Sequence, residues 1–223
     1  MFISELFYSV QGEGSLLGVP SVFIRTSGCN LRCSWCDTPY TSWKPEGQHL
    51  SLDQILDYTR QNSTGYTVVT GGEPMMAPDI VQLTQALRDL NQHITIETAG
   101  TIDAPVACDL MSISPKLSNS TPEGDWRERH ERTRLSVETL GRLTTEFEYQ
   151  LKFVVSRPED LEEIVDLAKK VSAPPHRVIL MPEGTDDKTL SDRGLWVSEL
   201  CKQHGFRFSP RLHVHLYGNR RGV

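Results

Sequence analysis

Short runs of apolar residues alternate along the chain with longer segments in which apolar residues recur every three or four positions. The short runs predict buried strands, and the longer segments predict amphipathic helices. The predicted strands cover residues 22–25, 66–70, 94–98, 110–114, 147–155, 177–181 and 206–209. The predicted helices cover residues 51–60, 78–90, 158–171 and 188–204, and a capping-box pattern at Ser51 and Gln54 opens the first of them. This alternation predicts an α/β fold with mostly parallel strands.

The chain length favours an open sheet over a closed one. A complete eight-fold (β/α) barrel takes about 250 residues, whereas this chain has 223. We therefore expect an open or partial (β/α) barrel. No repeat or linker divides residues 1–223, so we expect a single domain, from which the proline- and charge-rich stretch 118–133 projects as an exposed excursion.

The unusual residues of the chain follow the predicted strands. They occur in a cysteine-rich loop and in the segments 70–74, 97–100, 114–116 and 181–184. In parallel α/β folds, the carboxyl ends of the strands meet at one edge, and functional sites form there. The five segments are therefore expected to build one site.

Composition narrows the class of protein. Hydrophobic residues make up 38% of the chain and charged residues 23%, as in ordinary globular domains. The net charge of −6 gives no general basic surface for nucleic acid, and no apolar run is long enough to span a membrane. The first ten residues do not resemble a signal peptide, so we expect a cytoplasmic protein without nucleic-acid or membrane partners.

Three of the five cysteines lie close together, in the spacing Cys29-x3-Cys33-x2-Cys36. Three neighbouring thiolates can hold three corners of a [4Fe–4S] cluster and leave the fourth iron open to a small molecule. The alternative is a non-catalytic zinc-binding module, which usually needs a fourth ligand or a second C-x2-C pair. No such pair is present, and the isolated Cys108 and Cys201 are expected to be packing residues.

This spacing resembles that of the radical S-adenosylmethionine superfamily. In that superfamily, S-adenosylmethionine chelates the open iron, and the reduced cluster cleaves it to a 5′-deoxyadenosyl radical. The resemblance implies that one segment binds the methionine amino group, a second contacts the ribose and carboxylate, and a third packs on adenine. The implied residues are, in that order, Gly72 and Glu73; Ser114, Pro115 and Lys116; and Met181, Pro182, Glu183 and Gly184. Glu97 is a further candidate for a ribose hydroxyl, although ordinary strand-end turns would also account for these segments.

The first forty residues carry a narrower resemblance. Gln11-Gly12-Glu13-Gly14, Gly18-Val19-Pro20 and Cys36-Asp37-Thr38, with the later Gln150-Leu151-Lys152-Phe153-Val154, resemble the 7-carboxy-7-deazaguanine synthase family of 7-deazapurine (queuosine-type) biosynthesis. The resemblance implies a lyase that contracts 6-carboxy-5,6,7,8-tetrahydropterin to 7-carboxy-7-deazaguanine, releases ammonia and regenerates S-adenosylmethionine. It also implies a homodimer and an electron donor such as flavodoxin or ferredoxin.

The same resemblance suggests how a pterin and a metal ion would be bound. The implied contacts are Val10, Gln11, Gly12 and Glu13 for the pterin edge, Arg25 for the carboxylate, Thr70 for a hydroxyl contact, and Thr38 for Mg²⁺. Arg25 suits a carboxylate because its guanidinium binds it bidentately. A structural ion pair is the alternative for Arg25, and a helix N-cap is the alternative for Thr38.

One enzymatic alternative shares the cysteines and much of the fold. An activase of a glycyl-radical enzyme would need a protein-docking surface and no reader for a pterin edge, which the run 11–14 and Thr38 argue against. At the other end of the chain, His213 and His215 are expected on one face of a strand, without a metal. We expect the basic tail that contains Arg220 and Arg221 to be solvated or to contact a second subunit.

Overall fold

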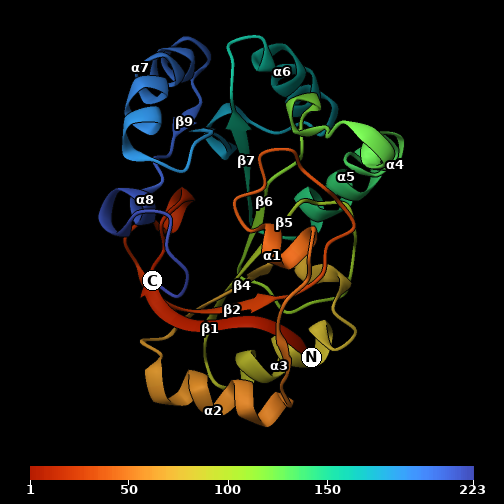
Figure 1. Cartoon of the computed structure of the whole chain (residues 1–223), viewed down its shortest axis with the longest axis vertical. Coiled ribbons are helices and arrows are strands. Elements are labelled where there is room, and N and C mark those ends of the chain that lie inside the picture. Colours follow the sequence, from red (N-terminus) through yellow and green to blue (C-terminus); the bar gives the residue numbers. More distant parts are fainter.

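The computed structural model describes all 223 residues and is built on one nine-stranded sheet (Figure 1). The strand order is β3-β1-β2-β4-β5-β6-β7-β8-β9. Pairing is antiparallel between β1 and its two neighbours and parallel from β2 through β9. Because β3 and β9 remain as free edges, the sheet is an open partial barrel, and the predicted fold class is confirmed.

The strands begin and end close to the predicted positions. Their bounds are β1 (Phe2–Val10), β2 (Pro20–Thr26), β3 (Gln48–His49), β4 (Tyr66–Gly71), β5 (His93–Thr98), β6 (Leu110–Ile113), β7 (Tyr149–Val155), β8 (Val178–Pro182) and β9 (Arg207–Phe208). The pattern of apolar residues did not predict β1 and β3. In β1 the pairing register shifts between Ile3 and Glu5, which interrupts the alternation that marks a half-buried strand.

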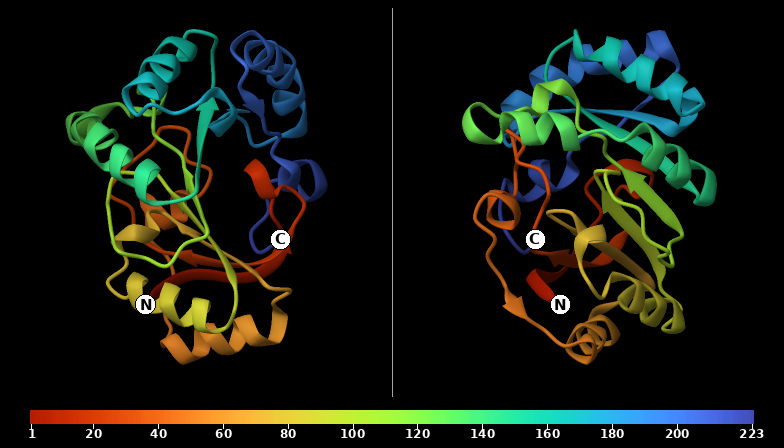
Figure 2. Two further views of the ribbon diagram at one scale, coloured as in Figure 1. Left: turned by 180° about the vertical axis from the view of Figure 1, so that it is seen from behind. Right: turned by 90° about the vertical axis from the view of Figure 1, so that its right-hand side faces the viewer.

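The longer helices lie around the outside of the curved sheet, whereas the short α1 (Pro39–Ser42) and α8 (Leu212–Tyr217) border its concave side (Figure 2). The other helices are α2 (Leu52–Asn62), α3 (Ile80–Asp89), α4 (Arg127–Thr133), α5 (Val137–Glu146), α6 (Asp160–Lys170) and α7 (Asp187–His204). The predicted capping box at α2 is present, since the Gln54 amide donates to Ser51 Oγ at 3.2 Å and the Ser51 amide donates to Gln54 Oε1 at 2.9 Å. None of the helices combines the length and apolar character needed to cross a membrane.

The stretch 118–133 is largely exposed, as predicted, but it is also anchored. It forms two short 3-10 turns and α4, and its Ser120 and His130 are fully buried. Ser120 Oγ lies 2.9 Å from His130 Nε2. The many charged residues of this stretch gave no indication that Ser120 and His130 are buried.

Strand β7 shows how the sheet separates its core from its site. Leu151, Phe153 and Val155 are fully buried in the main hydrophobic core. Successive side chains of a strand point to opposite faces, and Lys152 and Val154 accordingly line a cavity on the other side. The concave face of the sheet is therefore polar and available for ligands, while the convex face packs against helices.

Candidate active site

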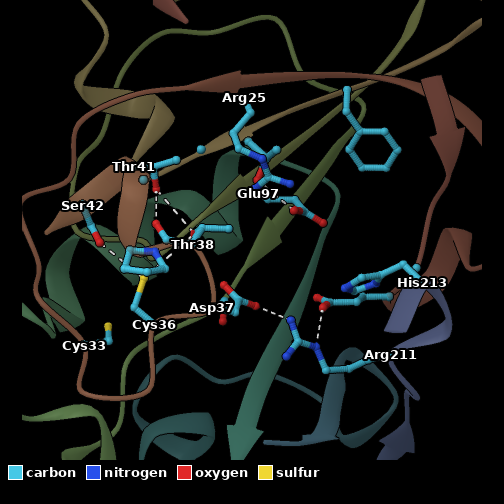
Figure 3. Close-up of a pocket in the computed structure, with 18 of the residues that line it drawn as sticks. Arg25, Cys33, Cys36, Asp37, Thr38, Thr41, Ser42, Glu97, Arg211 and His213 are labelled. Atoms are coloured by element: carbon cyan, nitrogen blue, oxygen red, sulfur yellow. Dashed lines mark hydrogen bonds and ion pairs between the residues drawn. The ribbon is translucent and has the colours of Figure 1, made fainter. Parts of the chain in front are cut away.

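One cavity of about 450 Å³ lies at the carboxyl ends of the parallel strands (Figure 3). This volume is within the range of pockets that bind small molecules. All five predicted segments contribute to its wall, and so do the residues 10–13 that follow from β1. The predicted site residues that do not line it are Glu73, Pro115, Pro182 and Gly184.

The three clustered cysteines all face this cavity. The Leu31 amide donates to Cys29 Sγ at 3.4 Å, and Ser42 Oγ lies 3.3 Å from Cys36 Sγ. Burial raises the pKa of Cys29 to about 12 and that of Cys33 to about 11. Both side chains are therefore protonated thiols in the metal-free protein, and binding of iron would displace their protons.

The stretch 118–133 holds the backbone of the cysteine loop. The Arg32 amide donates to His130 Nδ1 at 3.2 Å, and the Ser34 amide donates to the Ser120 carbonyl at 2.9 Å. Trp35 Nε1 donates to the carbonyl of the neighbouring Asn119 at 3.0 Å. These contacts fix the loop from its outer side, so that the sulfur atoms remain directed inward.

The donor set fits an iron–sulfur cluster better than a single metal ion. No three Cys, His, Asp or Glu side chains lie close enough together to ligate one ion. A tetrahedral zinc site needs its ligands around one centre, whereas a cubane cluster bonds each thiolate at a separate corner. Cys108 and Cys201 do not line the cavity; their thiols donate to the carbonyls of Ile94 and Arg207, at 3.7 and 3.4 Å.

Gly72 and Glu73 have different positions in the loop after β4. A Cβ atom on Gly72 would lie 2.2 Å from the Gly28 carbonyl oxygen, so only glycine permits this approach to the cysteine loop. The Glu73 carboxylate is buried behind the cavity wall and accepts from Thr98 Oγ1 at 2.7 Å and the Ala99 amide at 2.8 Å. Burial raises its pKa despite these donors. Glu73 therefore connects the loops that follow β4 and β5.

The segments after β6 and β8 contribute polar and apolar groups to the cavity wall. Lys116 Nζ donates to Ser114 Oγ at 2.9 Å and lies 5.6 Å from the centre of the Trp35 ring. Met181 and Glu183 line the wall at the end of β8. An ammonium group, a hydroxyl and a thioether are thus available on the cavity wall.

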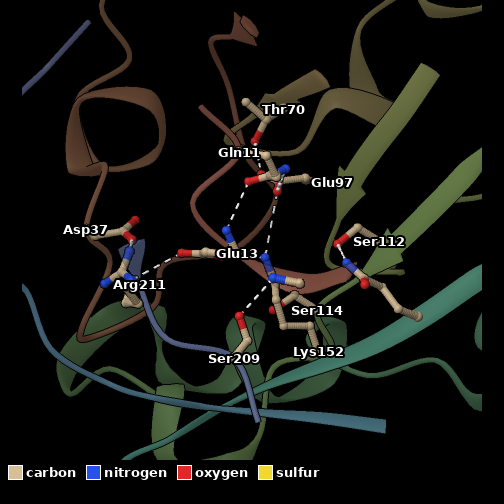
Figure 4. A network of polar contacts seen from close by, with 12 residues as sticks. Gln11, Glu13, Asp37, Thr70, Glu97, Ser112, Ser114, Lys152, Ser209 and Arg211 are labelled. Carbon is tan, nitrogen blue, oxygen red and sulfur yellow. Dashed lines mark hydrogen bonds and ion pairs between the residues drawn. The ribbon is translucent and has the colours of Figure 1, made fainter. Parts of the chain in front are cut away.

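Another part of the wall is a hydrogen-bonded group that joins the segment after β1 to β4 and β5 (Figure 4). Gln11 Nε2 donates to Glu97 Oε1 at 3.2 Å, and Thr70 Oγ1 donates to Glu97 Oε2 at 3.0 Å. The Glu13 amide donates back to Gln11 Oε1 at 3.2 Å. Glu97, expected near a ribose, is thus placed among the residues predicted to bind substrate.

Sequence reasoning missed the charged residues around Glu13. Its carboxylate forms ion pairs with Lys152 and Arg211, and Arg211 also pairs with Asp37 (Figure 4). Burial by itself would raise the pKa of Glu13, but Lys152 and Arg211 outweigh it and hold this pKa well below its ordinary value. The sign of this shift means that folding favours the carboxylate form.

The Glu13 shift predicts a specific dependence of stability on pH. A carboxylate whose pKa is depressed by folding stabilises the protein above its ordinary pKa of 4.5, and this contribution is lost as the pH falls below that value. We expect Glu13→Gln to lower the free energy of unfolding at pH 7 by about 1–3 kcal/mol. Between pH 5 and about pH 3, wild type should lose more stability than Glu13→Gln.

Denaturant titrations of both proteins across this pH range measure the difference. Glu199→Gln is the matched control, because Glu199 is exposed and pairs only with Lys202. The control should follow the wild-type pH curve. Parallel curves for wild type and Glu13→Gln would show that Glu13 is not stabilised as a carboxylate.

Arg25 forms a structural ion pair and also has donors left for a ligand carboxylate, the two roles considered for it. Its Nε lies 2.7 Å from Glu5 Oε2, so the structural ion pair is present, and the guanidinium lies 5.5 Å from the centre of the Phe7 ring. Tyr40 holds Glu5 from the other side by donating to the same Oε2 at 2.9 Å. Arg25 also lines the cavity, and its terminal nitrogens donate to no protein group. They remain available for a ligand carboxylate.

Thr38 occupies the N-cap position of α1, but its side chain makes no capping hydrogen bond. Its hydroxyl accepts from Thr41 Oγ1 at 3.4 Å and lies 3.9 Å from Cys36 Sγ (Figure 3). Thr38 also lines the cavity. Thr38 therefore stands at the N-cap without capping the helix through its side chain, and its hydroxyl is free of that role.

The C-terminal residues differ from prediction in two respects. His213 and His215 belong to helix α8 and not to a strand; His213 lines the cavity, whereas His215 pairs with Asp187 outside it. The tail 219–223 borders the cavity, which was not predicted, while its residues 219–222 remain exposed to solvent as expected. Its Arg221 lies 3.4 Å from the centre of the Tyr40 ring. Helix α8 has only six residues, and the spacing of its two histidines, two positions apart, is also that of a strand.

Comparison with known proteins identifies close relatives. Residues 23–116 match the family model of the Radical SAM superfamily. The chain is 45% identical to a 7-carboxy-7-deazaguanine synthase from Halobacterium salinarum, with 97% of this chain and 90% of that protein aligned. It is 43% identical to the enzyme of the same name from Rhodopirellula baltica, over 100% and 89%. The crystal structure of QueE from Escherichia coli is similar, with a TM-score of 0.72, 28% identity, and 95% and 94% coverage.

Proposed function

Because the chain belongs to the 7-carboxy-7-deazaguanine synthase family of radical S-adenosylmethionine enzymes, we propose that its cavity binds 6-carboxy-5,6,7,8-tetrahydropterin and contracts it to 7-carboxy-7-deazaguanine with release of ammonia. Its cofactors are a [4Fe–4S] cluster and S-adenosylmethionine, which together supply a 5′-deoxyadenosyl radical when bound. The observation that carries the proposal is that the wall of one cavity joins the cysteine loop to the segment 10–13.

On one side of the cavity, the chain would hold the cluster and its ligand. Cys29, Cys33 and Cys36 supply the thiolates, and the close approach at Gly72 brings free backbone next to them. The Lys116 ammonium suits the methionine carboxylate, and Ser114 offers a hydroxyl to the ribose. Met181 and Glu183 stand at the end of β8, where adenine would pack. Glu73 would act on this side by holding the loop, since it is not on the cavity wall.

On the other side, the chain would bind the pterin. The backbone of residues 10–13 offers both donors and acceptors for a pterin edge, and Gln11 and Thr70 are already oriented by Glu97. Arg25 provides terminal guanidinium nitrogens for the substrate carboxylate. Phe7 and Phe23 stack with their ring centres 4.8 Å apart and form an apolar part of the wall that excludes water.

We further propose that Mg²⁺ joins Thr38 to the substrate. One protein hydroxyl is a weak ligand for an ion that gives up its waters reluctantly, so tight binding requires oxygens from the substrate. We expect Thr38→Ala to raise the Mg²⁺ concentration needed for activity at least about ten-fold. Thr38→Ser should retain much of the activity because it retains the hydroxyl. Melting temperatures should not change, since the side chain caps no helix.

Rates measured over a Mg²⁺ titration, together with melting temperatures of the same variants, test this role. Cluster absorbance serves as the control, because the metal is proposed to bind substrate and not to fold the protein. Identical Mg²⁺ titrations for wild type and Thr38→Ala would rule the role out.

Four further properties follow from the family, the cavity and the cysteines. We propose flavodoxin or ferredoxin as the electron donor and a homodimer as the assembly, on the basis of family membership. The small-molecule substrate is consistent with the cavity volume. We propose a cytoplasmic location because thiols that bind iron must stay reduced, as they do in that compartment.

An anaerobic assay tests the proposed reaction. Cluster-loaded protein is supplied with 6-carboxytetrahydropterin, dithionite, S-adenosylmethionine and Mg²⁺, and mass spectrometry is used to detect 7-carboxy-7-deazaguanine. We expect product only when the protein, the pterin, the reductant and S-adenosylmethionine are all present. S-adenosylmethionine cleavage without product from this substrate would favour an activase, and a colourless protein that contains zinc would favour a structural module.

A further inference from the structure

Arg211 is a buried arginine that contacts three separate segments of the cavity wall (Figure 3). Only 7% of its surface is exposed. Its Nε donates to Glu13 Oε1 at 3.1 Å, and its Nη1 donates to the Gly184 carbonyl at 2.6 Å. Its Nη2 pairs with Asp37. One planar guanidinium therefore spans three loops that come from distant parts of the sequence.

Each contacted loop has a different task in the proposed function. Glu13 belongs to the segment that would read the pterin, and Asp37 lies between Cys36 and Thr38 in the cysteine loop. Gly184 ends the segment proposed for adenine. Arginine suits this place because its donors point in several fixed directions, whereas the single ammonium group of lysine cannot reach three such acceptors equally well.

The residues around Arg211 fasten the end of the chain to its beginning. The Gly14 amide donates to Ser209 Oγ at 2.8 Å, and the Leu212 amide donates to the Gly12 carbonyl at 2.9 Å. Figure 1 shows α8 beside the red segment that follows β1. Since β9 is a free edge of the sheet, these contacts connect the open side of the partial barrel to the pterin segment.

Electrostatics explains why this connection depends on Arg211. Glu13 and Asp37 are carboxylates that share the Arg211 guanidinium. The other charged and titratable groups facing this centre are Lys152, which pairs with Glu13, together with His213, Glu97 and, toward Asp37, Arg25. Without the guanidinium, Asp37 would lose the cation that it pairs with directly, and the two carboxylates would repel each other. The pterin segment and the cysteine loop would then move apart.

We propose that Arg211 is a positioning residue that fixes the pterin segment 10–13 relative to the cysteine loop. The consequence for catalysis rests on the proposed function. The contacts of Arg211 with Glu13, Asp37 and Gly184, which we call the Arg211 clasp, are a property of the chain itself. A displacement of about 1 Å between reacting groups can lower a rate by about a hundred-fold. Loss of Arg211 should therefore separate cleavage of S-adenosylmethionine from formation of product.

Hydrogen–deuterium exchange on the purified full-length protein tests the clasp without any activity. Arg211→Met should increase amide exchange in segments 10–14 and 36–38, and at Leu212, while the core strands β5 and β6 stay protected. Arg211→Lys should give a smaller increase and serves as the decisive variant if Arg211→Met does not fold. The matched control is Arg207→Met, since Arg207 contacts the same N-terminal segment, through Ser15 Oγ at 2.9 Å, from an exposed position. Unchanged exchange in these segments of a folded Arg211 variant would overturn the proposal.

The ratio of 5′-deoxyadenosine to 7-carboxy-7-deazaguanine tests the catalytic consequence. In wild type and Arg207→Met, product should form without accumulation of 5′-deoxyadenosine. In the Arg211 variants, product should fall about ten- to a hundred-fold while cleavage continues. A fall in product without any accumulation of 5′-deoxyadenosine would assign Arg211 to general stability and overturn the positioning role. If wild type itself makes no product, the proposed function fails, and the exchange measurement still decides whether the clasp exists.

Discussion

Cys33→Ala should lose both the [4Fe–4S] absorption spectrum and all cleavage of S-adenosylmethionine. Two remaining thiolates cannot hold a cubane cluster whose fourth iron has no protein ligand. Cys33 is buried against Leu31 and Ala99, so alanine leaves a small apolar gap and the chain should still fold. Iron content, sulfide content and visible absorbance after anaerobic reconstitution measure the loss directly.

Cys108→Ala is the matched control for this experiment. Cys108 is also shielded enough that burial raises the pKa of its thiol to about 12, but it does not line the cavity. Cys108→Ala should therefore retain full iron content and full cleavage. If Cys108 proved essential for iron and Cys33 dispensable, the assignment of the cluster ligands would be wrong.

Arg25→Lys should weaken substrate binding about ten- to a hundred-fold while iron content stays at the wild-type level. Lysine keeps the positive charge, and with it the ion pair with Glu5, but loses the planar fork that binds a carboxylate bidentately. A charged hydrogen bond of this kind contributes about 1.5–3 kcal/mol. The effect should appear as a raised KM for the pterin at saturating S-adenosylmethionine.

Arg60→Lys provides the comparison, because Arg60 forms an exposed ion pair with Asp57 on α2, far from the cavity wall. It should leave KM unchanged. Wild-type affinity in a correctly folded Arg25→Lys protein would mean that Arg25 serves only its ion pair with Glu5.

Local patterns were sufficient for most of the fold and for part of the site. The parallel strands are short apolar runs, and the cysteines and the loop at Gly72 are contiguous motifs at their ends. Each of these signals is contained in a few consecutive residues of the sequence. The antiparallel β1 was missed because its bulge breaks the alternation, and α5 because Gly141 and several threonines weaken a helical pattern.

The ion pairs around Glu13 could not be predicted in the same way. Arg211 is 198 positions from Glu13 and 174 from Asp37, so no local pattern connects them. Lys152 did carry a signal. It is a charged residue in a strand whose neighbours Leu151 and Phe153 are fully buried. Because strand side chains alternate between faces, a lysine there had to face the cavity and to find an acidic partner.

Turnover relative to S-adenosylmethionine tests the central claim most directly. The loaded enzyme is given limiting S-adenosylmethionine, excess 6-carboxytetrahydropterin, Mg²⁺ and reductant under anaerobic conditions, and 7-carboxy-7-deazaguanine, ammonia and 5′-deoxyadenosine are measured. An enzyme that regenerates S-adenosylmethionine in each turnover should release product and ammonia in equal amounts. Both amounts should be well in excess of the S-adenosylmethionine supplied, and 5′-deoxyadenosine should not accumulate. Absence of 7-carboxy-7-deazaguanine, or product that stops at the amount of S-adenosylmethionine added, would contradict the account.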